Sequence, residues 1–168
     1  MDRTDNSRIR KRLMREESRT PPERSGEIDI ANHATLAYSY EDPDHLLYHL
    51  IDGHCGRGAT RWAGARPNTA ERIVLEFDDP QRISRVVYEV EECSHPRTQE
   101  VRVEVSTDHG RTYRQVLAQD YTFSPQGATF QREDLRLDLT AITDLELILV
   151  PNKGGSGVAT LTSLRLFA

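Results

Sequence analysis

Seven polar and aromatic side chains in the second half of the chain could together form a binding site for a sugar. They are Glu92, His95, Arg97, Tyr121, Phe123, Asn152 and Lys153. Planar guanidinium, imidazole and amide groups can bridge neighbouring hydroxyls of a sugar ring, while an aromatic ring packs against its apolar face. These residue types therefore predict carbohydrate recognition. For any one of them, solvation of an ordinary loop is an equal alternative, so the hypothesis depends on their occurring together.

Two pairs of histidine and cysteine raise the alternative of a metal site. His54 and Cys55 are adjacent, and Cys93 and His95 are separated by one residue. Two imidazoles and two thiols could complete a tetrahedral zinc set. The spacing is not that of a zinc finger, however, and a chance meeting of two loops is the commoner explanation. We therefore do not expect zinc.

The sequence offers little for catalysis, since it contains no nucleophile elbow, phosphate-binding loop or zinc-protease helix. The glycine-rich segment 154–157 precedes a predicted strand, so it would lack the helix dipole that holds a phosphate. Glu91 and Glu92 would point to opposite faces of a strand, which is poor geometry for acid–base catalysis. We expect a binding module and not an enzyme.

Short segments with a hydrophobic period of two must position these side chains. They are β-branched or alternating and are bounded by turn residues, which predicts strands over 72–77, 83–90, 101–106, 130–139, 145–150 and 158–167. One helix is expected over 43–51, with Asp42 as its N-cap and Pro43 in its first position. Many short strands and almost no helix predict an all-β fold, an antiparallel β-sandwich or jelly roll.

The connections between these strands should alternate between two ends of the sandwich. One end then collects the short turns at 79–82, 107–112 and 140–144. The other end collects the long connections at 52–69, 91–99, 119–129 and 151–157. Long loops on a rigid scaffold are where binding usually resides, so we expect the site at the second end.

The first 26 residues differ in composition from the rest. Residues 1–25 contain eight basic and five acidic residues, whereas the remaining 143 contain 14 basic and 22 acidic ones. Segment 1–26 is too poor in apolar residues to offset its ordering entropy, which predicts a flexible basic arm ahead of a domain over 27–168. A docking helix or a tether to an anionic surface is the alternative. The acidic balance of the domain argues against nucleic-acid binding.

The sequence also bears on the location of the protein. No apolar run approaches the roughly 20 residues that a membrane span needs, and the N-terminus lacks the apolar stretch of a secretory signal. We expect a cytoplasmic location, unless a signal was removed from the chain.

Four segments occur here in an order that resembles a known family. LIDGHCGRGATRW at 50–62, RIVLEFDDPQRISRVVYEV at 72–90, VEVSTDHGRTYRQV at 103–116 and GVATLTSLRLF at 157–167 resemble the discoidin, or coagulation-factor type C, family of galactose-binding-like β-sandwiches. The resemblance covers about 31–168 and implies that fold. Carbohydrate-binding members of the family use an Arg or His after the second core strand and an Asn before the last strand. His95, Arg97 and Asn152 match those positions.

The same resemblance implies a structural calcium ion. Family members often hold calcium with the Asp of an Asp-Gly pair, the Thr of a Thr-x-Trp motif and a Glu in the last strand. Asp52 and Thr60 match, but Ser163 stands at the Glu position. Calcium takes six to eight oxygen ligands that include charged ones, so the missing carboxylate predicts a weaker site. Trp62 itself is expected to fill the core, with stacking on a ligand as the alternative.

Two functions follow from the sequence. The loop chemistry favours a non-catalytic carbohydrate-binding module. The lack of a signal sequence favours an intracellular protein–protein interaction domain within a larger assembly as the alternative.

Overall fold

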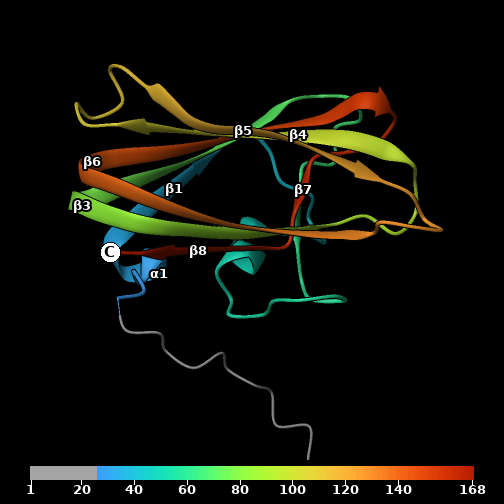
Figure 1. Ribbon diagram of the computed structural model, residues 1–168, viewed down its shortest axis with the longest axis horizontal. Coiled ribbons are helices and arrows are strands. Elements are labelled where there is room, and N and C mark those ends of the chain that lie inside the picture. Colours follow the sequence, from blue (N-terminus) through green and yellow to red (C-terminus); the bar gives the residue numbers. More distant parts are fainter. Residues whose placement is uncertain (1–25) are drawn as a thin grey trace, which may run out of the picture.

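Two long, bent strands form the frame of the molecule. The computed structural model describes residues 26–168, in which β3 (Glu71–Glu91) and β6 (Phe130–Gly155) pair antiparallel along their length. Figure 1 shows both strands folding back at one end of the molecule, at its left. The register of the pair shifts between Glu76 and Arg85. Pro80 lies in this stretch and has no N–H for the ladder, which explains why the pairing is irregular there.

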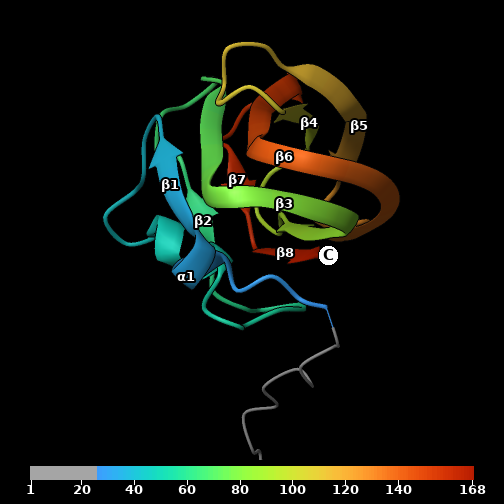
Figure 2. The same cartoon turned by 90° about the vertical axis from the view of Figure 1, so that its left-hand side faces the viewer.

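The remaining strands complete an antiparallel sandwich, as the sequence predicts. The main sheet has the order β1-β3-β6-β4-β5, and β8 pairs with the second half of β3. Their bounds are Ala34–Tyr38 for β1, Arg97–Ser106 for β4, Arg114–Phe123 for β5 and Ser163–Phe167 for β8. A second, two-stranded sheet pairs β2 (Trp62–Ala63) with β7 (Thr160–Leu161). Seen end-on in Figure 2, the strands curve around a common interior.

The core lies between the two layers and is built from alternating strand residues. In β4, Val101, Val103 and Val105 are buried while the residues between them are partly exposed. Trp62 is completely buried, and its indole Nε1 donates a hydrogen bond to the carbonyl of Tyr40 at 3.1 Å. The prediction that Trp62 fills the core is confirmed.

The helix predicted over 43–51 is wrong except for one 3-10 turn, η1, at Leu47–Leu50. The side chain of Asp42 accepts a hydrogen bond from the Asp44 N–H at 2.8 Å, which forms a turn and not a helix cap. The Asp42 N–H donates to the carbonyl of Ala63, and the Ala63 N–H donates to the carbonyl of His45. Pairing with β2 therefore overrides the local helical signal.

The first and last described residues lie side by side. The Ala168 N–H donates to the carbonyl of Gly26 at 2.8 Å, and Glu27 forms a bridge with Phe167. A short helix, α1 (Ile30–His33), follows and was not predicted. The predicted arm, 1–26, falls almost entirely outside the described residues, so the arm and the domain boundary stay predictions. Of the helices in the described part of the chain, none has the length and apolar character needed to cross a membrane.

Candidate functional site

The connections gather at one end of the sandwich, as strand alternation predicts, but three of them are shorter than expected, since 97–99 belong to β4, 119–123 to β5 and 151–155 to β6. The contacts that join them are Arg57 Nη1 to Thr129 Oγ1 at 2.8 Å, Asn152 Nδ2 to Asn68 Oδ1 at 2.7 Å, Gly58 N to Glu91 Oε2 at 2.9 Å and Arg97 Nη1 to Pro151 O at 3.0 Å. We call this the loop end. It lies at the right of Figure 1, away from the fold-back of β3 and β6.

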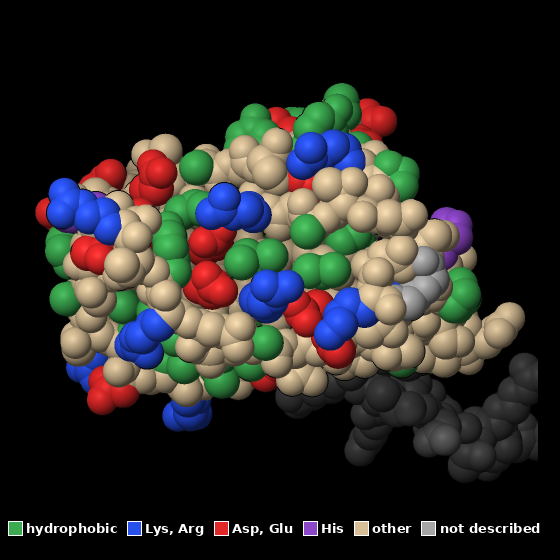
Figure 3. Space-filling model, turned by 90° about the horizontal axis from the view of Figure 1, so that it is seen from above, with side chains coloured by type: hydrophobic (Ala, Val, Ile, Leu, Met, Phe, Trp, Pro, Cys, Tyr) green, Lys and Arg blue, Asp and Glu red, His purple; other side chains and the backbone are tan. Residues whose placement is uncertain are grey.

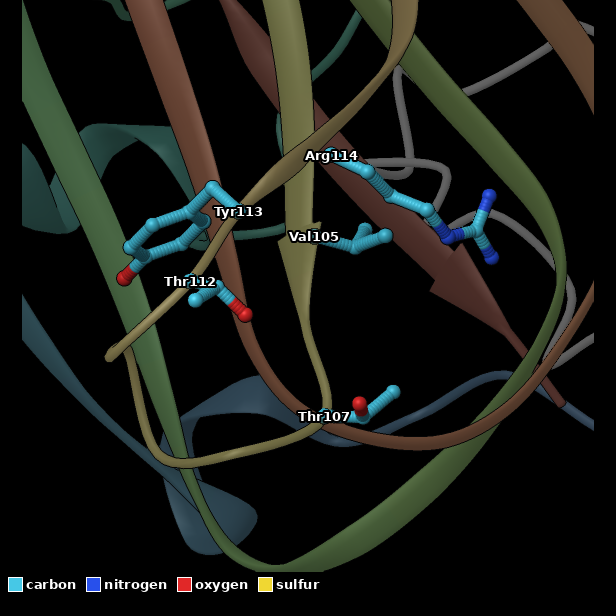
Figure 4. Close-up of a pocket in the computed structure, with 5 residues that line it drawn as sticks. All are labelled: Val105, Thr107, Thr112, Tyr113 and Arg114. Atoms are coloured by element: carbon cyan, nitrogen blue, oxygen red, sulfur yellow. The ribbon is translucent and has the colours of Figure 1, made fainter.

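The opposite end holds the turn at 107–112 and a shallow pocket. The pocket has a volume of about 110 Å³ and is lined by Val105, Thr107, Thr112, Tyr113 and Arg114. Figure 4 shows the side chains of Tyr113 and Arg114 pointing away from each other. Because a ligand site needs polar groups that converge, this pocket is a poor candidate.

Arg97 lies beneath the loop end and does not reach its surface. Its buried guanidinium donates to Glu92 Oε2 at 3.0 Å, Gln99 Oε1 at 2.7 Å, the Pro151 carbonyl at 3.0 Å and Thr160 Oγ1 at 2.9 Å. Burial lowers the pKa of Arg97, and the carboxylate of Glu92 opposes this effect. All these contacts are internal, so Arg97 fits the role of an organiser of the loops and not that of a direct sugar contact.

Glu92 also serves the architecture of its loop. Its Oε1 accepts hydrogen bonds from the N–H groups of Ser94, at 2.8 Å, and His95, at 3.0 Å. Burial alone would raise the pKa of Glu92, but these two N–H groups and Arg97 together lower it. The side chain of His95 is 66 % exposed and remains available for contact.

The two aromatic residues expected to form a platform face the interior. Tyr121 and Phe123 are both buried. The Tyr121 hydroxyl lies 2.7 Å from that of Tyr88 and donates to Glu133 Oε2 at 2.8 Å. Burial raises the pKa of Tyr121. The structure therefore places neither ring where a ligand could stack on it.

Asn152 and Lys153 do lie at the surface of the loop end. The ammonium of Lys153 is hydrogen-bonded to Glu100 at 2.9 Å and to Asp120 at 3.0 Å, and these hydrogen bonds raise its pKa. Lys and Arg side chains are interspersed with Asp and Glu on the face seen in Figure 3. Such paired charges give little attraction for a phosphate backbone.

A group of exposed apolar residues was missed from the sequence. Its members and their exposed fractions are Tyr38 at 49 %, Tyr40 at 43 %, Leu46 at 40 % and Tyr48 at 64 %. The guanidinium of Arg66 stacks over the ring of Tyr40 at 5.0 Å from its centre. The alternation Tyr38-Ser39-Tyr40 at the end of β1 was the available signal, because it places both rings on one face of the strand.

Three buried side-chain polar atoms within residues 26–168 have no hydrogen-bond partner. They are Arg61 Nε, Asn152 Oδ1 and Thr162 Oγ1. Arg61 and Thr162 flank the small β2–β7 sheet, and Asn152 bonds Asn68 across the loop end. Buried polar groups in folded proteins are nearly always paired, so each exception needs an explanation.

Comparison with known proteins identifies the fold family. The model of the F5/8 type C domain matches residues 34–162. The chain belongs to the F5/8 type C family. Among curated proteins, none matches it.

Several solved structures with the same fold come from Clostridium perfringens. The CBM32-1 and CBM32-2 domains of ZmpB, in complex with GalNAc, are 16 % identical with a TM-score of 0.61, over 85 % of this chain and 36 % of that one. The family 32 CBM of NanJ, in complex with galactose, is 11 % identical with a TM-score of 0.60, over 85 % and 98 %. The CpGH89CBM32-5 module, in complex with GalNAc-beta-1,3-galactose, is 20 % identical with a TM-score of 0.58, over 84 % and 99 %. At these identities the likeness shows the fold.

The calcium ligands expected for an F5/8 type C domain do not form a fitting set here. Asp52 already accepts hydrogen bonds from Thr60 Oγ1 at 2.5 Å and from the His54 N–H at 2.9 Å. Burial would raise the pKa of Asp52, but Thr60 and His54 lower it. Ser163 occupies the expected Glu position and offers no carboxylate.

Two carboxylates of β3 hold the same loop by its backbone. Ser163 pairs in register with Glu89, whose Oε2 accepts the Gly56 N–H at 2.7 Å. Glu91 Oε2 accepts the Gly58 N–H at 2.9 Å. An N–H group cannot ligate a cation, so the loop presents the wrong polarity to calcium.

The four residues considered for zinc are also not gathered into a site. The side chain of His54 contacts Asp52, while Cys93 Sγ donates to Glu91 at 3.6 Å. Within the described range, 26–168, no group of three or more His, Cys, Asp or Glu side chains is placed to hold a metal ion.

We expect calcium to leave the thermal stability of the domain unchanged. Calcium present at a hundred times its Kd would add about 2.7 kcal/mol to the free energy of unfolding, which is readily detected. Melting temperatures should therefore agree in calcium and in EDTA, with magnesium as the control for ionic strength. A melting temperature raised by calcium alone would contradict this expectation.

Proposed function

We propose that this F5/8 type C domain is a non-catalytic module that binds carbohydrate at its loop end. The observation that carries the proposal is that two partly buried side chains of the loop end, Arg61 and Asn152, each keep a polar atom with no hydrogen-bond partner among residues 26–168. Arg61 Nε is a donor and Asn152 Oδ1 is an acceptor. Sugar hydroxyls both donate and accept, so a saccharide suits this pair.

The loop end offers further groups of the kind that recognise sugars. His95 and Asn68 on connecting loops, and Asn152 near the end of β6, present an imidazole and two amides. Arg66, two residues before Asn68, stacks on the exposed ring of Tyr40. That stack supplies a flat surface for the apolar side of a sugar ring, the role first expected of Tyr121 and Phe123. Arg97 and Glu92 support the site from beneath.

Galactose and GalNAc are the appropriate first probes. They are the sugars named with the ZmpB and NanJ modules that share this fold. For the present chain they are a proposal, because identities of 16 % and 11 % carry the fold alone.

Titration with galactose should shift the backbone NMR signals of Asn68, His95 and Asn152. Asn152→Ala should weaken binding by roughly 2- to 12-fold, because one net hydrogen bond contributes about 0.5 to 1.5 kcal/mol. Gln115→Ala is the matched control, since it removes an exposed amide near the opposite end. It should leave the Kd unchanged.

Shifts confined to residues 107–112 would refute the loop-end site, and no binding to any saccharide on a glycan array would refute the carbohydrate proposal as a whole. The first outcome would place binding at the hairpin pocket of Figure 4. The second would favour the alternative below.

A protein–protein interaction is the second candidate function. It is favoured by the exposed side chains of Tyr38, Tyr40, Leu46 and Tyr48, because aromatic residues are enriched at interfaces. A Tyr48→Ser variant should then lose a partner that the native chain captures in a pull-down, and keep its melting temperature. The cytoplasmic location stays a prediction, which cell fractionation would check.

A further inference from the structure

Arg61 lies in the connection 52–69 of the loop end, directly before β2. The β2–β7 register ends at Trp62↔Leu161, so Arg61 and Thr162 flank this last pair. Trp62 fills the core, whereas Arg61 is only partly buried.

Arg97 belongs to the same neighbourhood. Its guanidinium contacts Thr160, which pairs with Ala63 in the β2–β7 sheet. Burial is the main cause that lowers the pKa of Arg97, and the positive charge of Arg61 lowers it further. Two guanidinium groups thus lie within electrostatic reach of each other, and Glu92 is the carboxylate that pairs with one of them.

Arg61 is an exception among the arginines of the described chain. Five other arginines are buried or partly buried, and each has a carboxylate within 4.0 Å: Arg66 with Glu71, Arg85 with Asp134, Arg97 with Glu92, Arg102 with Glu100 and Arg165 with Glu27. Arg61 is also partly buried, yet within residues 26–168 its side chain has no such partner and its Nε has no hydrogen bond.

An unpaired guanidinium in a partly buried place is unfavourable, because charges removed from water need a partner. Asp42 is within electrostatic reach of Arg61 but forms no ion pair with it, and the Nε of Arg61 has no acceptor among the described residues. One anionic group with several oxygens would supply both a charge partner and an acceptor. A guanidinium binds a carboxylate or a sulfate through two parallel N–H bonds.

We propose that Arg61 binds an anionic group of the ligand, a carboxylate or a sulfate, so that the domain prefers acidic saccharides to neutral ones. This inference rests on the proposed carbohydrate-binding function and adds the charge class of the ligand. Arg61 contacts the anionic oxygens through its guanidinium.

Calorimetric titration of the full chain with three saccharides tests the inference. Galacturonate and galactose 6-sulfate should each bind at least about tenfold more tightly than galactose. A hydrogen bond between charged groups contributes about 1.5 kcal/mol or more, which corresponds to that factor. Arg61→Gln should remove that preference, so that the Kd values of the three sugars agree within about twofold. Arg57→Gln is the matched control, because Arg57 also lies at the loop end but bonds Thr129 and stacks on Phe130. It should keep the preference.

The possible results separate the inference from the function on which it rests. If galactose binds as tightly as both acidic sugars, or if Arg61→Gln keeps the preference, the inference is wrong and the carbohydrate function stands. If inorganic sulfate alone binds as tightly as galactose 6-sulfate, the group bound is a free anion and the inference is wrong. If none of the three sugars binds, both proposals fail for this class of sugar. If Arg61→Gln does not fold, Arg61→Lys is the second variant. It keeps the positive charge but lacks the two parallel N–H donors, so it should reduce the preference for acidic sugars.

Discussion

Replacing Trp62 by alanine will destabilise the domain by about 3 to 5 kcal/mol, the cost of deleting a large aromatic side chain from a packed core. The ring is completely buried, and its Nε1 hydrogen bond to the Tyr40 carbonyl fixes the segment after β1 to β2. Denaturant unfolding of the variant and of the native chain measures the difference. Tyr48→Ala is the control, because 64 % of Tyr48 is exposed and its removal should change stability by less than about 0.5 kcal/mol.

The opposite pattern would identify Trp62 as a ligand platform. In that case Trp62→Ala would weaken sugar binding and leave the free energy of unfolding unchanged. A loss of stability below about 1 kcal/mol would contradict the core assignment.

Arg97→Ala should destabilise the domain by about 3 to 5 kcal/mol, because it leaves the buried partners of a charge unpaired. Glu92 loses its cation, while Gln99 and Thr160 lose a donor. The loop above is also built against this side chain, since a Cβ at Gly157 would come within 2.8 Å of Arg97 Cδ. Lys153→Ala removes an exposed paired cation and should cost no more than about 1 kcal/mol. An unchanged melting temperature for Arg97→Ala would show that Arg97 acts at the surface.

The pH dependence of stability gives this prediction a second measurement. The pKa of Glu92 is lowered in the folded domain from its ordinary value of 4.5, despite its burial, by the Ser94 and His95 N–H groups and by Arg97. A depressed pKa contributes stability above 4.5 that is lost as the pH falls through the folded value. Without Arg97 the depression is smaller. The variant should therefore lose less stability than the native chain when the pH is lowered below 4.5.

Most strands were predictable because alternation of apolar residues survives in them. Segments 72–77 and 83–90 proved to be the two halves of β3, and 130–139 and 145–150 lie within β6. Turn residues between the halves suggested separate strands, but the chain bends there and stays paired. The pattern shows where residues face a core, but it does not show whether a bend interrupts the hydrogen bonds.

β5 was missed because its alternation is broken. The register between β4 and β5 shifts between Val103 and Glu104, so Val116 and Leu117 fall next to each other as half-buried residues. A bulge of this kind inserts one residue into the period and removes the sequence signal for a strand.

The gathering of the loops could be predicted, but the directions of several side chains could not. Arg97 begins β4 in phase with Val101 and Val103, which fixes its direction toward the interior. Strand phase competes with the general rule that charged residues are exposed, and here the phase decides. The same reasoning applies to Tyr121 and Phe123 in β5. The pairing of Arg66 with Glu71 and its stacking on Tyr40 depend on contacts that no local pattern encodes.

The junction of residue 26 with Ala168 determines how the domain would be held. β8 runs from Ser163, beside Glu89, away from the loop end, and its last residues pair with the first described ones. In Figure 1 the C-terminus lies at the end opposite the long loops. A second protein domain attached at either end of the described chain would therefore join this domain at the same place and leave the loop end exposed. If the domain binds carbohydrate as proposed, several copies joined in this way would bind one polysaccharide at the same time. Their combined avidity would then exceed the affinity of a single copy.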